Sequence, residues 1–188
     1  MVSDGIKLTR ESCSPPEGQH LIAGHMRIPL HNSLMILRLF KIVLLLSYGV
    51  VIGLDGFNNL VAPEGGFSEV RHVMSMDTTG NDPSYMWRAI DNETIQIIGY
   101  GGMIALQLLC GLLIFWAGWR MFRALRGSAT AFERAKGPGY AGVGLAIALW
   151  LGGFLGVGGY WFMMWLSASN NATDGSFQQA VAALLVLL

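Results

Sequence analysis

Apolar residues gather in long runs along this chain of 188 residues, and short polar segments separate the runs. Three runs, at residues 34–54, 94–119 and 140–166, are long enough to cross a bilayer as helices, which takes about 20 residues. A fourth run, residues 176–188, would reach only about 20 Å at about 1.5 Å per residue, against roughly 30 Å of hydrocarbon. The pattern predicts an all-α integral membrane protein: a bundle of four transmembrane helices, the last one short or truncated.

Residues 55–93 lie between the first two spans and are predicted to form a cap of short amphipathic helices outside the membrane. The first of these helices is indicated by apolar residues at helical spacing, namely Phe67, Val70, Val73 and Met74. Asp82-Pro83 then offers an N-cap followed by proline at the first helical position, which predicts a second short helix carrying Trp87. The alternative is a solvated connector between two spans.

Polar residues of the cap are candidates for holding it against the spans. Asp55, Asn58 and Asn59 share one helical face at the end of the first span. An acid at that depth is costly unless paired, so we expect Arg71 and Arg88 to pair with acids of the cap; a proton-handling role for Asp55 is less favoured. The acids available are Asp55, Asp77, Asp82 and Asp91. The predicted structural residues are Asp55, Asn58, Asn59, Arg71, His72, Asp77, Asp82, Trp87, Arg88 and Asp91.

Close packing of the spans is predicted from small residues and one buried amide. The third span carries a ladder of small residues in steps of four, which we expect another helix to approach closely: Gly144, Ala148, Gly152 and Gly156. Matching surfaces are offered by Gly49 and Gly53, or by Gly101 and Ala105. Gln107, near the middle of the second span, must find a hydrogen-bond partner on another helix, and this packing role is favoured over a transport site.

The remaining polar segment, residues 1–33, is predicted to be a partly disordered cytoplasmic tail preceding the membrane domain, residues 34–188. Its potential metal ligands follow irregular intervals that match no compact site, so no metal is predicted: Cys13, His20, His25 and His31. His72 with Met74 or Met76 could ligate haem or copper, but a solvated or paired histidine is favoured. No cofactor is expected.

Composition indicates the class of protein, and the distribution of charge predicts how the chain is oriented in the membrane. A chain that is 53% hydrophobic and 13% charged is too apolar for a soluble domain of this length. Ten of the twelve basic residues fall on the side of the tail and of the loop between the second and third spans, which predicts a cytoplasmic N-terminus in a bacterial inner membrane. The net charge is zero, so no nucleic-acid partner is expected.

Several segments together resemble a bacterial family described as predicted small integral membrane proteins, a domain of unknown function. The resemblance runs from about Met35 to the C-terminus and is carried by FNNL at Phe57–Leu60, VRHVMSMDTT at Val70–Thr79, MWRAI at Met86–Ile90 and GGYWFMMWLS at Gly158–Ser167. It implies four spans and no established activity.

Function is predicted from packing surfaces, because the sequence contains no catalytic constellation. We expect a non-catalytic accessory or structural subunit of a larger membrane complex, whose partners are other membrane subunits and lipid. A respiratory complex is a natural host for such a subunit. A small transporter or channel is the alternative, although only Gln107 and Tyr100 could line a path through the bilayer. A haem- or quinone-linked subunit is less favoured, because bis-histidine ligation in the membrane needs histidines on facing spans.

Overall fold

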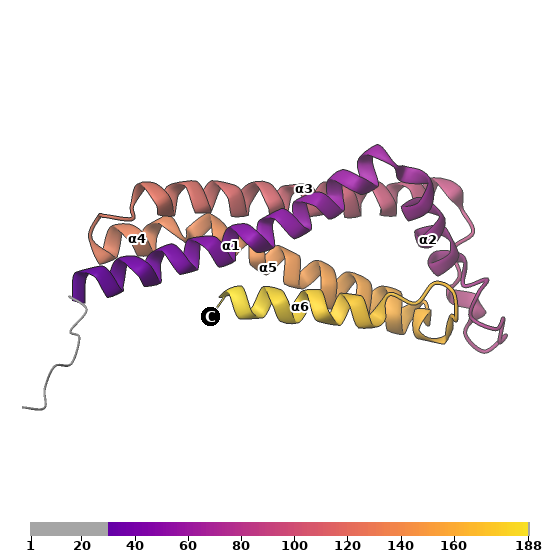
Figure 1. Ribbon diagram of the computed structural model, residues 1–188. Coiled ribbons are helices and arrows are strands. Elements are labelled where there is room, and N and C mark those ends of the chain that lie inside the picture. The colour runs from indigo at the N-terminus through magenta and orange to yellow at the C-terminus, as the bar shows by residue number, and fades with distance from the viewer. Residues whose placement is uncertain (1–29, 188) are drawn as a thin grey trace, which may run out of the picture.

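The computed structural model describes residues 30–187, and helices make up most of that length (Figure 1). In chain order the elements are α1 (Leu30–Val61), α2 (Pro63–Ser75), η1 (Met86–Arg88), α3 (Glu93–Arg123), α4 (Ala129–Ala135), α5 (Gly137–Ile147), η2 (Ala148–Trp161), η3 (Met164–Leu166) and α6 (Thr173–Leu187). η1 and η3 are single 3₁₀ turns, and η2 is a π-helix. The predicted tail, residues 1–33, falls almost wholly outside the described residues.

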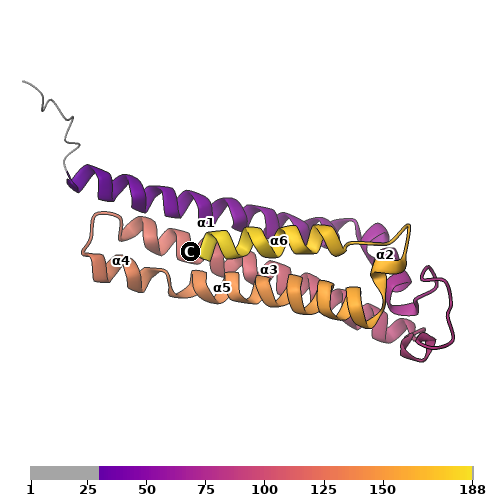
Figure 2. The same cartoon turned by 90° about the horizontal axis from the view of Figure 1, so that it is seen from below.

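Three helical segments are long and apolar enough to cross a membrane: Asn32–Val61, Glu93–Arg123 and Ala129–Trp161. The prediction of an all-helical integral membrane protein is therefore confirmed for three spans. α6 has 15 residues, which extend about 22 Å at about 1.5 Å per residue, less than the hydrocarbon thickness. It runs back between α1 and α5 and ends partway along them (Figure 2).

The first span is longer than predicted, because α1 continues without a break to Val61. Its last two turns carry the polar residues assigned to the cap, Asp55, Asn58 and Asn59. Asp55 and Asn59 are half-buried and face the bundle, whereas Asn58 is exposed. The expectation that all three face protein is thus wrong for Asn58, since residues three and four positions after Asp55 lie on opposite edges of one helical face.

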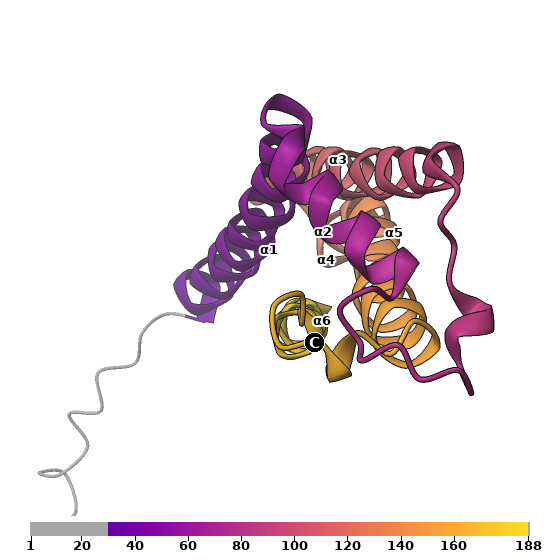
Figure 3. The same cartoon turned by 90° about the vertical axis from the view of Figure 1, so that its right-hand side faces the viewer.

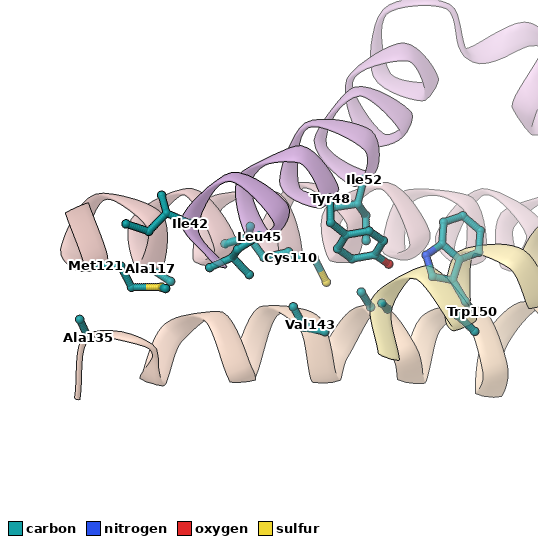
Figure 4. Packing of buried hydrophobic residues seen from close by; sticks show 14 of the residues in the cluster. Ile42, Leu45, Tyr48, Ile52, Cys110, Ala117, Met121, Ala135, Val143 and Trp150 are labelled. Atoms are coloured by element: carbon teal, nitrogen blue, oxygen red, sulfur yellow. The ribbon is translucent and has the colours of Figure 1, made fainter. Parts of the chain in front are cut away.

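Buried apolar side chains from α1, α3 and α5 meet in a single core that continues onto η2 and α6 (Figure 4). The backbones of α1 and α3 come into contact at glycine, since a Cβ placed on Gly111 would lie 3.1 Å from the Cα atom of Gly53. α5 packs equally tightly on α3, where a Cβ on Gly142 would lie 3.0 Å from the carbonyl oxygen of Cys110. Backbone contact of this kind favours helix association in lipid, where burying apolar surface contributes little.

η2 continues directly from α5. Its backbone hydrogen bonds join residues five apart in the sequence, whereas those of an α-helix join residues four apart. At its end the Phe162 N–H donates to the Val157 carbonyl at 2.9 Å, an i to i+5 bond. A Cβ on Gly156 would lie 3.2 Å from the carbonyl oxygen of Leu151, five residues earlier in the same helix. Glycine at this position therefore accommodates the π geometry.

The predicted ladder of small residues makes no helix contact within the described chain, so neither matching surface suggested for it in the first or second span packs against it. A Cβ on Gly144 or on Gly152 would meet nothing within 4 Å, and Gly156 would meet only its own helix. Ala148 is exposed as well. The small residues lie on the exposed side of the helix, whereas α3 packs on its other side, where Gly142 and Ala146 are buried. Gly53, Gly111 and Gly142 form the close contacts instead.

The contact between α1 and α3 can be tested by adding one methyl group. Gly111→Ala should destabilise the protein by about 1–3 kcal/mol, because the new Cβ would press on the backbone of Gly53. The thermal midpoint in detergent measures this loss. Gly101→Ala is the matched control on the same helix, since its Cβ would meet open space. Equal midpoints for the two variants would contradict the contact.

Candidate functional site beneath the cap

α2 and the loop that follows it, residues 63–92, form the cap as the structure defines it. α2 starts with Pro63 and has Glu64 in its first turn, where a carboxylate suits the helix dipole. It ends at Met76, whose left-handed backbone (φ 55°) turns the chain and whose side chain is fully buried. Seen from this end of the molecule, α2 crosses over the ends of the longer helices (Figure 3).

The second helix predicted for the cap is reduced to the 3₁₀ turn Met86–Arg88. Ala89 is extended, and the Ile90 N–H donates to the Met74 carbonyl of α2 at 2.8 Å. This hydrogen bond holds the chain in an extended form, which ends the turn before a helix can propagate.

Two side-chain hydrogen bonds join the cap to the loop before α6. The Asn170 amide donates to the Glu69 carboxylate at 2.6 Å, and the Ser167 hydroxyl donates to the Thr78 hydroxyl at 2.9 Å. Ser167 and Asn170 are both buried. The cap is therefore attached to a segment about 90 residues away in sequence.

The arginines of the cap do not pair with its acids, contrary to the prediction. Ion pairs among the described residues are limited to His72 with Asp77 at 2.9 Å and Lys136 with Glu133 at 2.7 Å. Asp82 accepts the Ser84 N–H at 2.9 Å, and this hydrogen bond holds the pKa of the Asp82 carboxyl below its ordinary value. The remaining acids named for these pairs, Asp55 and Asp91, make no ion pair in the described part of the chain.

Arg88 is instead held between two indole rings. Its guanidinium carbon lies 5.3 Å from the ring centre of Trp87 and 5.2 Å from that of Trp161. The two rings meet edge to face, 5.7 Å apart, and Arg88 also donates to the Trp161 carbonyl at 3.3 Å. Cation–π contact thus fastens the cap loop to the end of η2. The aromatic residues expected at a membrane surface contribute to this contact.

Beneath the cap, Gln107 finds the partner on another helix that its depth requires. Its side chain is only 2% exposed, and the Asn59 amide of α1 donates to its carbonyl oxygen at 3.3 Å. The Tyr100 hydroxyl donates to the Asn59 backbone carbonyl at 2.8 Å. Such bonds between membrane helices contribute about 0.6 kcal/mol on average, enough to favour one register of α1 on α3.

Two further polar side chains continue this arrangement and were missed in the sequence. The Tyr48 hydroxyl and the Trp150 indole nitrogen are buried without a hydrogen-bond partner among the described residues, and the hydroxyl is directed toward the indole (Figure 4). Tyr48 could have been found from its helical face, because it lies seven residues before Asp55. We call Tyr48, Asp55, Asn59, Gln107 and Trp150 the polar row.

An apolar pocket of about 360 Å³ lies beside the polar row, between α2, α3 and η2. α3 and η2 move apart toward the cap, and α2 lies across the space between them (Figure 1). The pocket opens where both helices present glycine: Gly99, Gly102, Gly153 and Gly158. Sequence inspection did not predict the pocket, because the four glycines by themselves do not show that the two helices diverge.

Potential metal ligands are scattered in the described part of the chain. No group of three or more histidine, cysteine or acidic side chains within it is placed to hold a metal ion. Cys110 is fully buried in the core, and His72 is paired with Asp77. What the arrangement provides is apolar binding volume, helix surface and hydrogen-bonding specificity.

These features define a small helical integral membrane protein with three long apolar helices and a folded cap at one end. The chain belongs to the family described as predicted small integral membrane proteins (DUF2165), whose sequence model matches residues 37–188. The family suggested by the sequence is thereby confirmed. No match to the chain was found among curated proteins or among solved structures.

The contact of Arg88 with the two tryptophans can be separated from an ion pair by a double-mutant cycle. Arg88→Ala and Trp161→Ala should each destabilise the protein, with a coupling energy of about 0.5–2 kcal/mol. Arg88→Ala and Asp82→Ala should show no coupling, since Asp82 bonds to Ser84. Thermal unfolding in detergent measures both cycles. Coupling of Arg88 with Asp82 but not with Trp161 would support an ion pair instead.

Proposed function

We propose that the protein is a non-catalytic accessory or structural subunit of a larger membrane complex. The observation that carries this proposal is a face of small residues on α5 and η2 that no other helix among residues 30–187 covers. Gly144 and Gly152 lie on it with open space around them, whereas Gly53, Gly111 and Gly142 are used for contacts inside the chain.

A face of this kind suits a partner helix. In lipid, large side chains keep helices apart. Small residues allow the backbones to approach closely, and this close approach strengthens dispersion and weak hydrogen bonds between the helices. The contacts at Gly53 and Gly142 show that this chain uses that principle for its own helices. In the proposed complex, Gly144, Ala148 and Gly152 make the corresponding contact with a helix of another subunit.

A small transporter or channel is less well supported. The polar row lies toward the cap, and farther along the bundle the described core between α1, α3 and α5 is apolar, with Ile114, Ala117 and Met121 all buried. Pockets lie on both sides of this apolar barrier, but a transport path also needs polar groups through it. The accessory role needs no such path.

Affinity purification of the tagged full chain in mild detergent tests the accessory role. Gly144→Leu should reduce the yield of a co-purifying membrane protein by about tenfold or more, because a large side chain would hold the partner helix away. The thermal midpoint of the isolated chain should not change, since Gly144 has open space around it.

The matched control is Gly101→Leu, the same substitution at an open position on α3. It should leave the partner bound. The proposal fails if no membrane protein co-purifies in fixed ratio, or if the two leucine variants retain the partner equally.

In this proposal the protein lies in a bacterial inner membrane with both termini in the cytoplasm, the cap outside, and α6 as a short fourth membrane helix. Support comes from charge. Arg120, Arg123, Arg126 and Arg134 gather at the end of the bundle opposite the cap, as cytoplasmic loops do.

Orientation can be measured with a membrane-impermeant maleimide on intact cells, in a Cys13→Ser background that leaves only buried Cys110. Ser84→Cys in the cap should be labelled directly, because position 84 is exposed. Ala131→Cys in α4 should be labelled only after the cells are opened. The opposite pattern would invert the orientation.

A further inference from the structure

We infer that the pocket beneath the cap binds one hydrocarbon chain of a phospholipid whose headgroup carries an ammonium group. The pocket has a volume of about 360 Å³, near the lower end of the range of about 300–1,000 Å³ for small-molecule sites. It therefore accommodates part of one chain and leaves the headgroup at its rim.

The walls determine that the occupant is a hydrocarbon. Val73, Met103 and Phe154 line the pocket from α2, α3 and η2, and the glycines between them leave backbone and open volume in place of side chains. A water molecule there would find few of the two to four polar partners it needs. Because the pocket lies between spanning helices, the neighbouring molecules that can fill it are lipid chains.

On the α2 side of the pocket, a methionine side chain can adapt to a flexible hydrocarbon chain. The sulfur of Met74 would lie 3.5 Å from a Cβ on Gly99, so this side chain of α2 covers the glycine face of α3. Methionine is unbranched and polarisable, and it adjusts to ligands of irregular shape. A rigid, flat ligand would need no such adaptable side chain.

Charge at the rim selects the headgroup. Among the described residues that line the pocket, Glu69 of α2 is the only charged one. Asn170, which also lines the pocket, donates to one of its oxygens at 2.6 Å and so fixes its position. A carboxylate attracts an ammonium group and repels a headgroup with net negative charge. The cap, residues 63–92, strengthens the preference for an ammonium headgroup, because its formal net charge is negative: it contains five acidic residues and two arginines.

Native mass spectrometry of the full chain tests the site with two lipids of identical chains, phosphatidylethanolamine and phosphatidylglycerol. The wild-type protein should bind one phosphatidylethanolamine per chain, and bind it about tenfold more tightly than phosphatidylglycerol. Gly102→Phe should abolish this binding, because position 102 lines the pocket and has room for a side chain.

Gly101→Phe is the matched control, since the neighbouring glycine is equally open but does not line the pocket. It should bind lipid as the wild type does, which also shows that a phenylalanine at this level of α3 is tolerated. Glu69→Gln should still bind a chain but lose the preference between the two headgroups.

Three results would overturn the inference: equal lipid binding by the Gly102→Phe and Gly101→Phe variants, equal affinity of the wild type for both lipids, or a peptide in the pocket. None of them depends on whether a partner subunit co-purifies, so this test and that of the accessory role are independent.

Discussion

The close approach of α1 to α3 is the contact on which the rest of the structure depends. In a bilayer the helices gain little by hiding apolar surface from one another, so backbone contact and hydrogen bonds must hold them. The Gly53–Gly111 contact brings α1 near enough for Asn59 to reach Gln107, and for Tyr100 to reach the Asn59 carbonyl. The same approach sets the end of α1, from which α2 crosses the bundle.

Glycine serves three purposes in this chain, and each follows from the missing side chain. At Gly111 it allows two backbones to touch, at Gly156 it accommodates a carbonyl oxygen of its own helix, and at Gly102 it leaves volume open. A small residue in a membrane helix is therefore not by itself a sign of helix contact. The neighbouring elements decide which purpose it serves.

The spans, the amphipathic helix of the cap and the need of Gln107 for a partner could be predicted, because apolar length, helical period and the cost of a buried amide are local properties. The partners of individual side chains could not be predicted. Arg88 had acids nearby in sequence, yet two tryptophans hold it, one of them 73 residues away. The small residues at Gly144, Ala148 and Gly152 do share one face, but their spacing could not show that no other helix of the described chain covers it. The pocket depends on the divergence of two helices, which only the tertiary structure reveals.

The π-helix also allows this protein to tolerate a change of chain length within η2. A π turn holds one residue more than an α turn, so deleting a residue within Ala148–Trp161 converts one turn to the α form and leaves both flanking segments facing the same way. The same deletion in α3 would rotate everything beyond it by about 100° and separate Gly111 from α1. Insertions and deletions among relatives should therefore be tolerated in η2 and excluded from α3, so that the third span absorbs the changes in length that the first two cannot.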